Sequence, residues 1–154
     1  MTHRALIAVA DGVEDIETVT LIDVLRRAEV EVVVAEGLTA SVRPLAFKRA
    51  MVNLAGNAAS HGDHVRLSAR ALASGGLEII VEDDGPGIPD DLRPHVFERF
   101  YRGDSSRHRG SGGGSGLGLS IVAALVAAHG GRVGVDTSPG VGATFWVRLP
   151  RLDD

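Results

Sequence analysis

Apolar positions along this chain follow two periods, that of helices and that of strands. Over residues 44–60, Met51, Leu54 and Ala58 fall on one face of a helix, and a second apolar helix is predicted over residues 116–129. Alternating or continuous apolar runs predict strands, the first two of them paired, over residues 30–35, 39–43, 65–72, 77–82, 132–136 and 143–149. This pattern predicts a two-layer α/β (α+β) sandwich with a mixed, largely antiparallel sheet and helices on one face.

The first 35 residues carry a pattern of their own. An apolar run over residues 6–10 precedes helical spacing over 16–25, and a strand-like run over 30–35 follows. A strand, a helix and a second strand in this order predict a right-handed βαβ unit with parallel strands. The N-terminal strand and helix are therefore expected to extend the sheet beside residues 30–35.

Composition limits the class of protein. A chain of 154 residues with 44% hydrophobic residues suits one compact domain. The absence of cysteine excludes disulfides, thiol nucleophiles and thiolate metal sites, and the net charge of −4 gives no electrostatic reason to expect nucleic acid. The apolar run over residues 5–10 is too short to span a bilayer and lacks a signal-peptide layout. We therefore expect a soluble, cytoplasmic chain with no membrane segment.

Three polar or glycine-rich segments carry candidate chemistry. Glycines alternate over residues 114–118 and run into the second helix, where bare backbone N–H groups can hold a phosphate. Asn53 and Asn57 lie four residues apart on the first helix, so their amides project together. Residues 81–88 form a strand that runs into the turn Asp83-Asp84-Gly85. Taken singly, these segments are a flexible joint, a solvated helix face and an ordinary turn.

Taken in this order and spacing, the segments resemble the catalytic ATP-binding domain of bacterial sensor histidine kinases, which has the Bergerat (GHKL) ATPase fold. Five motifs carry the resemblance over roughly residues 29–150: an asparagine box at 53–57, glycine boxes at 83–87 and 114–119, a phenylalanine box at 97–100 and a Gly-x-x-F element at 142–145. The resemblance implies ATP and Mg²⁺ as cofactors. It also implies phosphoryl transfer to a histidine on a separate dimerisation domain, with a response regulator as a further partner.

The resemblance assigns a task to each matching residue. Asn57 is the expected Mg²⁺ ligand, and Asp83 is expected to accept a hydrogen bond from the adenine amino group, which favours ATP over GTP. Thr144 would support the adenine through its hydroxyl, directly or through water. His61 matches a position for a ring near the nucleotide, and a helix-capping role is an equal alternative. Other residues expected around the nucleotide are Gly85 and Gly87, which would let the backbone pass close to the base, and Ile88, Phe97, Tyr101, Gly114, Gly116, Leu117, Gly118 and Leu119.

Residues 102–111 are rich in glycine, serine and arginine and resemble the lid that closes over the phosphates of ATP. Without ligand this segment is expected to be mobile, because it has little to bury. Arg102 is expected to act with Asn53 in catalysis, while Arg107 and Arg109 stay open as alternatives for the phosphate contact. A plain flexible loop is compatible with this assignment.

Asn53 separates two kinds of chemistry. The gyrase and Hsp90-like relatives of the superfamily have a glutamate at the matching position, which activates water, whereas an amide cannot accept a proton at neutral pH. We therefore expect little ATP hydrolysis. None of the six histidines stands in the helical context of the family's phosphoacceptor, so the chain alone is not expected to autophosphorylate.

Residues 4–28 resemble the start of the ThiJ/PfpI family, which has a flavodoxin-like fold, through the segments 4–7, 12–19 and 23–28. Glu17 matches a glutamate that would pair with that family's nucleophilic cysteine, and without any cysteine a deglycase or chaperone-like role is nearly excluded. The two resemblances together predict a chimera, engineered or recombined, with a βα segment over 1–28, the ATP-binding domain over 29–150 and a tail over 151–154. A scaffold that binds nucleotide at most is the alternative function. A natural kinase whose N-terminus acquired this pattern by chance is the alternative origin.

Overall fold

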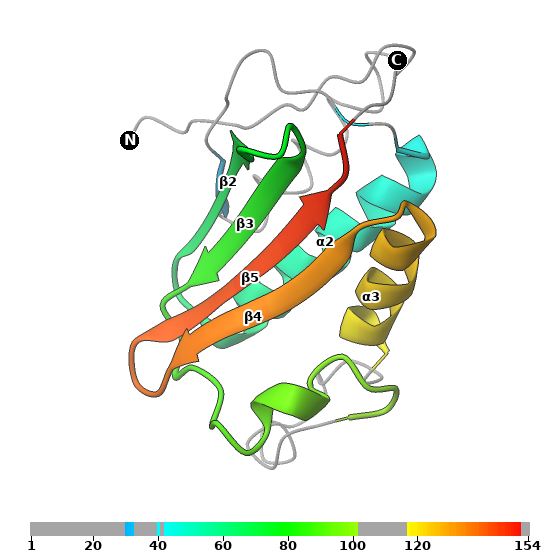
Figure 1. The fold of residues 1–154 in the computed structure, drawn as a ribbon. Coiled ribbons are helices and arrows are strands. Elements are labelled where there is room, and N and C mark those ends of the chain that lie inside the picture. The colour runs from blue at the N-terminus through cyan, green and yellow to red at the C-terminus, as the bar shows by residue number, and fades with distance from the viewer. Residues whose placement is uncertain (1–29, 33–39, 41, 102–116, 152–154) are drawn as a thin grey trace.

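A computed structural model describes residues 30–32, 40, 42–101 and 117–151 of the chain (Figure 1). The elements within these ranges are the strands β1 (Val30–Val32), β2 (Val65–Ala71), β3 (Leu77–Asp83), β4 (Arg132–Ser138) and β5 (Gly142–Leu149), the helices α2 (Pro44–His61) and α3 (Gly118–Ala128), and the short 3₁₀ helix η1 (Arg93–His95). The α-helices predicted over residues 44–60 and 116–129 and the last four predicted strands are confirmed, with ends shifted by at most two residues.

The strands form one sheet in the order β1-β2-β3-β5-β4. Strands β2, β3, β5 and β4 pair antiparallel, and β1 joins β2 in parallel, with Val30 opposite Val65. Helices α2 and α3 pack against each other on one face of the sheet, and the other face carries no helix of the described residues (Figure 1). The predicted two-layer sandwich with a mixed, largely antiparallel sheet is therefore confirmed for this part of the chain.

The core lies between the sheet and the two helices. Every second residue of β5 is buried, from Ala143 to Leu149, as a sheet with one covered face requires. Helix α2 presents Met51, Leu54 and Ala58 to the same core, which confirms its predicted apolar face. Burial of a side chain of the size of Leu54 contributes about 1.5–3 kcal/mol, so this face holds α2 on the sheet.

The strand predicted over residues 39–43 is wrong for those of its residues that the structure describes. Ala40, Val42 and Arg43 lie in no strand, and Arg43 is the N-cap of α2. Pro44 stands in the first turn of this helix, where its missing N–H costs no hydrogen bond. Val42 is half-buried and packs on the core, so the apolar alternation there reflects an irregular segment that leads into the helix.

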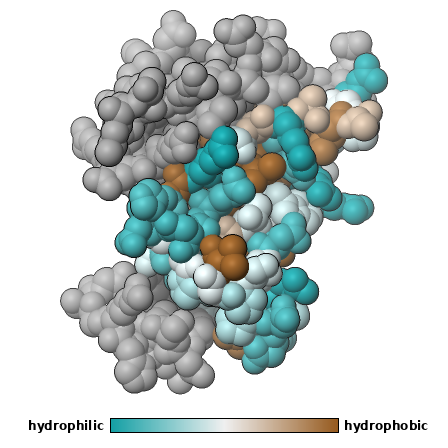
Figure 2. Space-filling model, turned by 90° about the vertical axis from the view of Figure 1, so that its left-hand side faces the viewer, coloured by the Kyte–Doolittle hydropathy of each residue, from teal (hydrophilic) through white to brown (hydrophobic). Residues whose placement is uncertain are grey.

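The N-terminal βα unit predicted over residues 1–28 lies outside the described residues, as do residues 33–35 of the first predicted strand. No helix within the described ranges has the length and hydropathy that a membrane crossing needs. The side of the molecule shown in Figure 2 is mainly hydrophilic over its described residues, with isolated hydrophobic positions. The buried apolar residues gather instead between the sheet and the helices.

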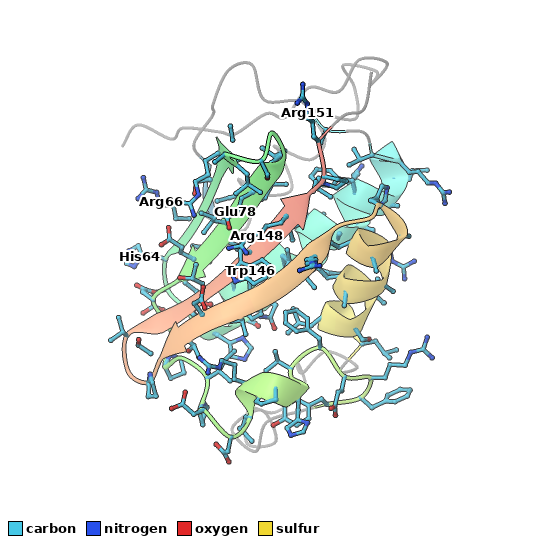
Figure 3. All side chains as sticks on the ribbon, in the orientation of Figure 1. His64, Arg66, Glu78, Trp146, Arg148 and Arg151 are labelled. Atoms are coloured by element: carbon cyan, nitrogen blue, oxygen red, sulfur yellow. The ribbon has the colours of Figure 1, made fainter. Side chains whose placement is uncertain are left out.

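One carboxylate is buried on the face of the sheet away from the helices. Glu78 alternates with the core residues Leu77 and Ile79, and its side chain is only 2% exposed. The Nε of Arg148 on β5 donates to Oε1 at 2.7 Å (Figure 3), and the Nε of Arg70 on β2 donates to Oε2 at 2.5 Å. Burial raises the pKa of the Glu78 carboxyl, but the hydrogen bonds and positive charges of the two arginines outweigh burial and hold the pKa below its ordinary value.

We expect Glu78→Gln to lower the free energy of unfolding by about 1–3 kcal/mol at neutral pH, because two guanidinium groups lose their charged partner. This range lies below that of a fully buried pair, because the Arg70 and Arg148 side chains are 66% and 48% exposed and water screens them. Since the folded-state pKa of Glu78 is depressed, its contribution is present above the unfolded-state pKa and is lost as pH falls through the folded-state pKa. Urea unfolding should therefore show a wild-type advantage at neutral pH that disappears in acid.

The matched control is Glu82→Gln, two positions beyond Ile80 on the same face of β3. This change should alter the free energy of unfolding by less than about 0.5 kcal/mol. A Glu78→Gln variant as stable as the wild type at neutral pH, or a difference that grows on acidification, would contradict the stabilising role of the Arg70–Glu78–Arg148 cluster.

Candidate functional site

The loop that follows β3 begins with a fixed carboxylate. Asp83, the last residue of β3, lies on the same side of the strand as the core residue Val81, toward the helices. Its Oδ1 accepts hydrogen bonds from the N–H groups of Gly85 at 3.0 Å and Ala143 at 3.4 Å. Its Oδ2 makes no hydrogen bond to any described residue. One carboxylate oxygen is therefore held by the backbone, while the other is available to a ligand.

The two glycines of this loop are required by the protein's own backbone. A Cβ on Gly85 would lie 2.6 Å from the carbonyl oxygen of His61 at the end of α2. Gly87 has a φ of +74°, and a Cβ there would lie 2.5 Å from the carbonyl oxygen of Ser138. The loop therefore passes tightly between the end of α2 and the turn that joins β4 to β5. The structure shows a close approach of both glycines to the protein's own backbone, while their approach to a base stays a prediction.

The neighbouring Asp84 is engaged elsewhere. Its Oδ1 accepts the backbone N–H of His64 at 2.9 Å, and its Oδ2 lies 2.7 Å from Nδ1 of the His64 ring (Figure 3 labels His64). The backbone N–H of His64, and then its ring, lower the pKa of the exposed Asp84 carboxyl. Of the two adjacent aspartates, Asp83 is therefore the one with an oxygen left over.

The two predicted amides lie on α2, beside its core face. Asn53 and Asn57 are both half-buried, and Nδ2 of Asn53 donates a long hydrogen bond of 3.5 Å to the carbonyl oxygen of Gly118 in α3. Because Asn57 lies one turn further along α2, its side chain leaves the helix on the same side, toward α3. No described residue makes a hydrogen bond to the Asn57 side chain. Its amide oxygen is therefore available to a ligand.

His61 closes the last turn of α2. Its Nδ1 lies 2.8 Å from the carbonyl oxygen of Asn57 and 3.1 Å from Oγ of Ser60, and the residue is exposed. Oγ of Ser60 donates to the same Asn57 carbonyl at 2.8 Å, so this carbonyl has a partner without His61. The His61 ring is bonded to the last turn of its own helix, which is the position that the capping alternative expects.

The N-terminus of α3 carries no side-chain cap. Leu117 precedes the helix and Gly118 is its first residue, while Leu119 packs on the core. N–H groups in a first turn without a side-chain cap stay available to an anion. The other predicted residues of this region lie outside the described ones, namely Gly114, Gly116 and the lid arginines Arg102, Arg107 and Arg109.

Two predicted apolar residues support the site from the core. Ile88 packs against the core, and the ring of Phe97 meets the ring of Phe145 edge-on, with centroids 6.1 Å apart. Tyr101 is half-buried, and its ring centroid lies 5.9 Å from that of His95. The contacts of Ile88 and Phe97 tie the segment after the Asp83 loop to the body of the domain, whereas the contact of Tyr101 with His95 lies within that segment.

Thr144 is not brought to the Asp83 side of the sheet. It alternates on β5 with the buried residues Ala143 and Phe145, so its side chain leaves the sheet on the face away from the helices. The residue opposite Asp83 in the register is Ala143. The predicted contact of the Thr144 hydroxyl with adenine is therefore corrected, because a strand turns successive side chains to opposite faces.

A family model described as histidine kinase-, DNA gyrase B- and HSP90-like ATPase matches residues 42–153. This range includes the two asparagines of α2, the loop after β3 and the whole of α3. The chain belongs to this family.

The most similar curated relatives of this ATPase-family domain include sensor histidine kinases. The chain is 45% identical over 116 residues to the signal transduction histidine-protein kinase AfsQ2 of Streptomyces coelicolor, a match that covers 75% of this chain and 21% of the relative. It is 48% identical over 111 residues to the signal transduction histidine-protein kinase/phosphatase MprB of Mycolicibacterium paratuberculosis, covering 68% of this chain and 21% of that protein. The chain thus spans about a fifth of the length of these relatives.

Solved structures of histidine kinases share the fold. The mycobacterial sensor histidine kinase MprB superposes with a TM-score of 0.69 at 31% identity, over 90% of this chain and 96% of that one. The NMR structure of the histidine kinase domain of the E. coli osmosensor EnvZ gives a TM-score of 0.64 at 34% identity, over 92% of this chain and 89% of that one. This ATPase-family chain is the catalytic ATP-binding domain of a two-component sensor histidine kinase.

The comparisons support one of the two family resemblances found in the sequence and not the other. The histidine kinase resemblance, carried by the five motifs, is confirmed. The ThiJ/PfpI resemblance and the chimera receive no support from the comparisons, and residues 1–28 lie outside the described ones. The N-terminal βα unit therefore stays a prediction from the sequence.

Proposed function

We propose that this histidine kinase domain binds ATP with Mg²⁺ between α2, α3 and the loop after β3, and donates the γ-phosphoryl group to a histidine on a separate dimerisation domain. The phosphorylated histidine would then serve a response regulator. The observation that carries the proposal is the Asp83 carboxylate, which two backbone N–H groups hold in place with one oxygen left over. The half-buried amide of Asn57 lies in the helical layer, on the side of the sheet to which Asp83 points.

The Asp83 carboxylate supports recognition of adenine. Its Oδ2 can accept a hydrogen bond from the amino group of adenine, whereas guanine carries an acceptor oxygen at the same ring position. Hydrogen bonds to an ionised acceptor are shorter and stronger than those between neutral groups. The N–H of Gly85 holds the carboxylate before a ligand arrives, which reduces the ordering that binding must impose. We therefore expect ATP to bind in preference to GTP.

The donor set of the described residues fits a Mg²⁺ ion that is held mainly by phosphate. No group of three or more acidic, histidine or cysteine side chains in this part of the chain could hold a metal ion by itself. Asn57 offers one neutral amide oxygen, which has no hydrogen-bonded partner among the described residues. Mg²⁺ usually keeps several waters and binds one or two protein ligands together with substrate phosphates. When bound, the ion neutralises charge on the phosphates.

Asn53 supports transfer rather than hydrolysis. Its amide cannot take a proton from water at neutral pH, and its Nδ2 is directed to the carbonyl of Gly118 at the start of α3. In the proposed transfer, the bond between the γ-phosphorus and the bridging oxygen of ADP breaks, and a bond to an imidazole nitrogen of the acceptor forms. The acceptor ring releases its proton. The domain contributes mainly by position, with adenine at Asp83 and the phosphates near the N–H groups of α3.

Incubation with γ-labelled ATP tests the transfer. The chain alone should stay unlabelled, and the dimerisation domain of the parent kinase, supplied separately, should become labelled at its histidine. Asn57→Ala should slow this labelling by about tenfold or more, because a hydrogen bond or ligand contact to a charged group contributes about 1.5–3 kcal/mol. The measurement is the initial rate of label transfer at a fixed ATP and Mg²⁺ concentration.

Gly56→Ala is the matched control for Asn57→Ala. Gly56 is exposed on the same helix, and a Cβ there would meet nothing within 4 Å, so transfer should proceed at the wild-type rate. Labelling of the isolated chain, or release of free phosphate faster than transfer, would contradict the proposal. Saturable ATP binding without transfer to the parent domain would favour the alternative, a recombined scaffold that binds nucleotide only.

A further inference from the structure

A single hydroxyl joins three segments next to Asp83. Thr137 lies half-buried on β4. Its Oγ1 accepts the N–H of Ile88, in the loop after β3, at 2.7 Å and donates to the carbonyl oxygen of Gly142, at the start of β5, at 3.1 Å. Because the one hydroxyl hydrogen is directed to Gly142, the lone pairs of Oγ1 are left to the N–H of Ile88. The hydroxyl therefore accepts a hydrogen bond from one segment and donates a hydrogen bond to another.

Backbone contacts close the same region. The N–H of Gly140, in the turn between β4 and β5, donates to the carbonyl oxygen of Pro86 at 2.7 Å. Gly142 packs so closely on the carbonyl oxygen of Asp83 that an added Cβ would collide with it. The β4–β5 turn therefore packs directly on the loop that follows Asp83. The Thr137 side chain links the two through its hydrogen bonds.

We propose that Thr137 is a positioning residue for nucleotide binding. It fixes the loop over residues 84–88, whose Gly85 N–H holds Oδ1 of Asp83, and it does not itself touch the nucleotide. The inference rests on the adenine role proposed above for Asp83. Valine at this position would keep the shape of the side chain but leave the Ile88 N–H and the Gly142 carbonyl without their partner, whereas serine would keep the hydroxyl.

ATP titration of the full chain with Thr137→Val and Thr137→Ser tests this inference. Thr137→Val should weaken ATP binding by about tenfold, and Thr137→Ser should bind within about threefold of the wild type. Amide hydrogen exchange supplies a readout that a general loss of stability would not produce. Exchange at Ile88 should be about tenfold faster in Thr137→Val, while exchange at Val81, in the centre of the sheet, should keep its wild-type rate.

Unchanged ATP affinity in Thr137→Val, or an equal loss in the valine and serine variants, would overturn the positioning role. Exchange that accelerates equally at Ile88 and Val81 would also overturn it, because the change would then be global. If the wild type itself binds no ATP, the function proposed above fails. Exchange at Ile88 then still decides the link from Thr137 to the loop: faster exchange in Thr137→Val supports it, and an unchanged rate overturns it.

Discussion

Replacing Asp83 with alanine should lower the affinity of the chain for ATP by about 100-fold. The variant loses the ionised acceptor for the adenine amino group, and a hydrogen bond to a charged group contributes about 1.5–3 kcal/mol. It also loses the side chain that holds the N–H groups of Gly85 and Ala143, so the loop must be ordered when the ligand binds. Calorimetric titration of wild type and variant with ATP measures the ratio of the two dissociation constants.

Glu82→Ala is the matched control for Asp83→Ala. It removes the preceding carboxylate of β3, whose side chain leaves the sheet on the face away from the helices. This variant should bind ATP with the wild-type affinity. If Asp83→Ala binds as tightly as the wild type, or if both variants lose affinity equally, Asp83 does not hold the base.

Gly142→Ala should lower the free energy of unfolding by about 2–4 kcal/mol. Gly142 has a φ of +133°, a conformation in which other residues are strained by about 1–3 kcal/mol. The added Cβ would also collide with the carbonyl oxygen of Asp83, which cannot move without a shift of the end of β3. Because the collision falls on Asp83 itself, ATP affinity should fall together with stability.

Gly140→Ala, two residues earlier in the same turn, separates collision from backbone strain. Gly140 also has a positive φ, +80°, but a Cβ there would meet nothing within 4 Å. The expected loss is about 1 kcal/mol, with unchanged ATP affinity. Urea unfolding of both variants gives the comparison. A loss in Gly142→Ala no larger than that in Gly140→Ala would contradict the close packing of β5 on the loop.

The spacing of apolar residues predicted most of the fold, because each helix and strand buries one side against the core. The apolar face of α2 around Leu54 and the alternation along β5 both follow from a sheet with helices on a single face. The strand predicted over residues 39–43 is wrong at its described residues Ala40, Val42 and Arg43, because an irregular segment can alternate in the same way. Val42 packs on the core there, and Pro44 then starts the helix.

The motifs predicted correctly which segments form the candidate site. They were a weaker guide to the role of each residue within it. Asp83 and Asn57 keep side-chain oxygens available within the described structure, while their contacts with adenine and Mg²⁺ stay predictions. Thr144 turns to the other face, because the register of β3 and β5 sets Ala143 opposite Asp83. Thr137 could not be predicted from local pattern, because its partner Ile88 lies 49 residues away in the sequence.

Calorimetric titration of the wild-type chain with ATP and with GTP, each with and without Mg²⁺, is the most direct test of an adenine-nucleotide site at Asp83. We expect saturable ATP binding with a dissociation constant on the order of 10⁻⁶ to 10⁻³ M, tighter with Mg²⁺ than without it, and weaker binding of GTP. A folded chain that gives no saturable binding of ATP, or that binds GTP equally well, would contradict this site.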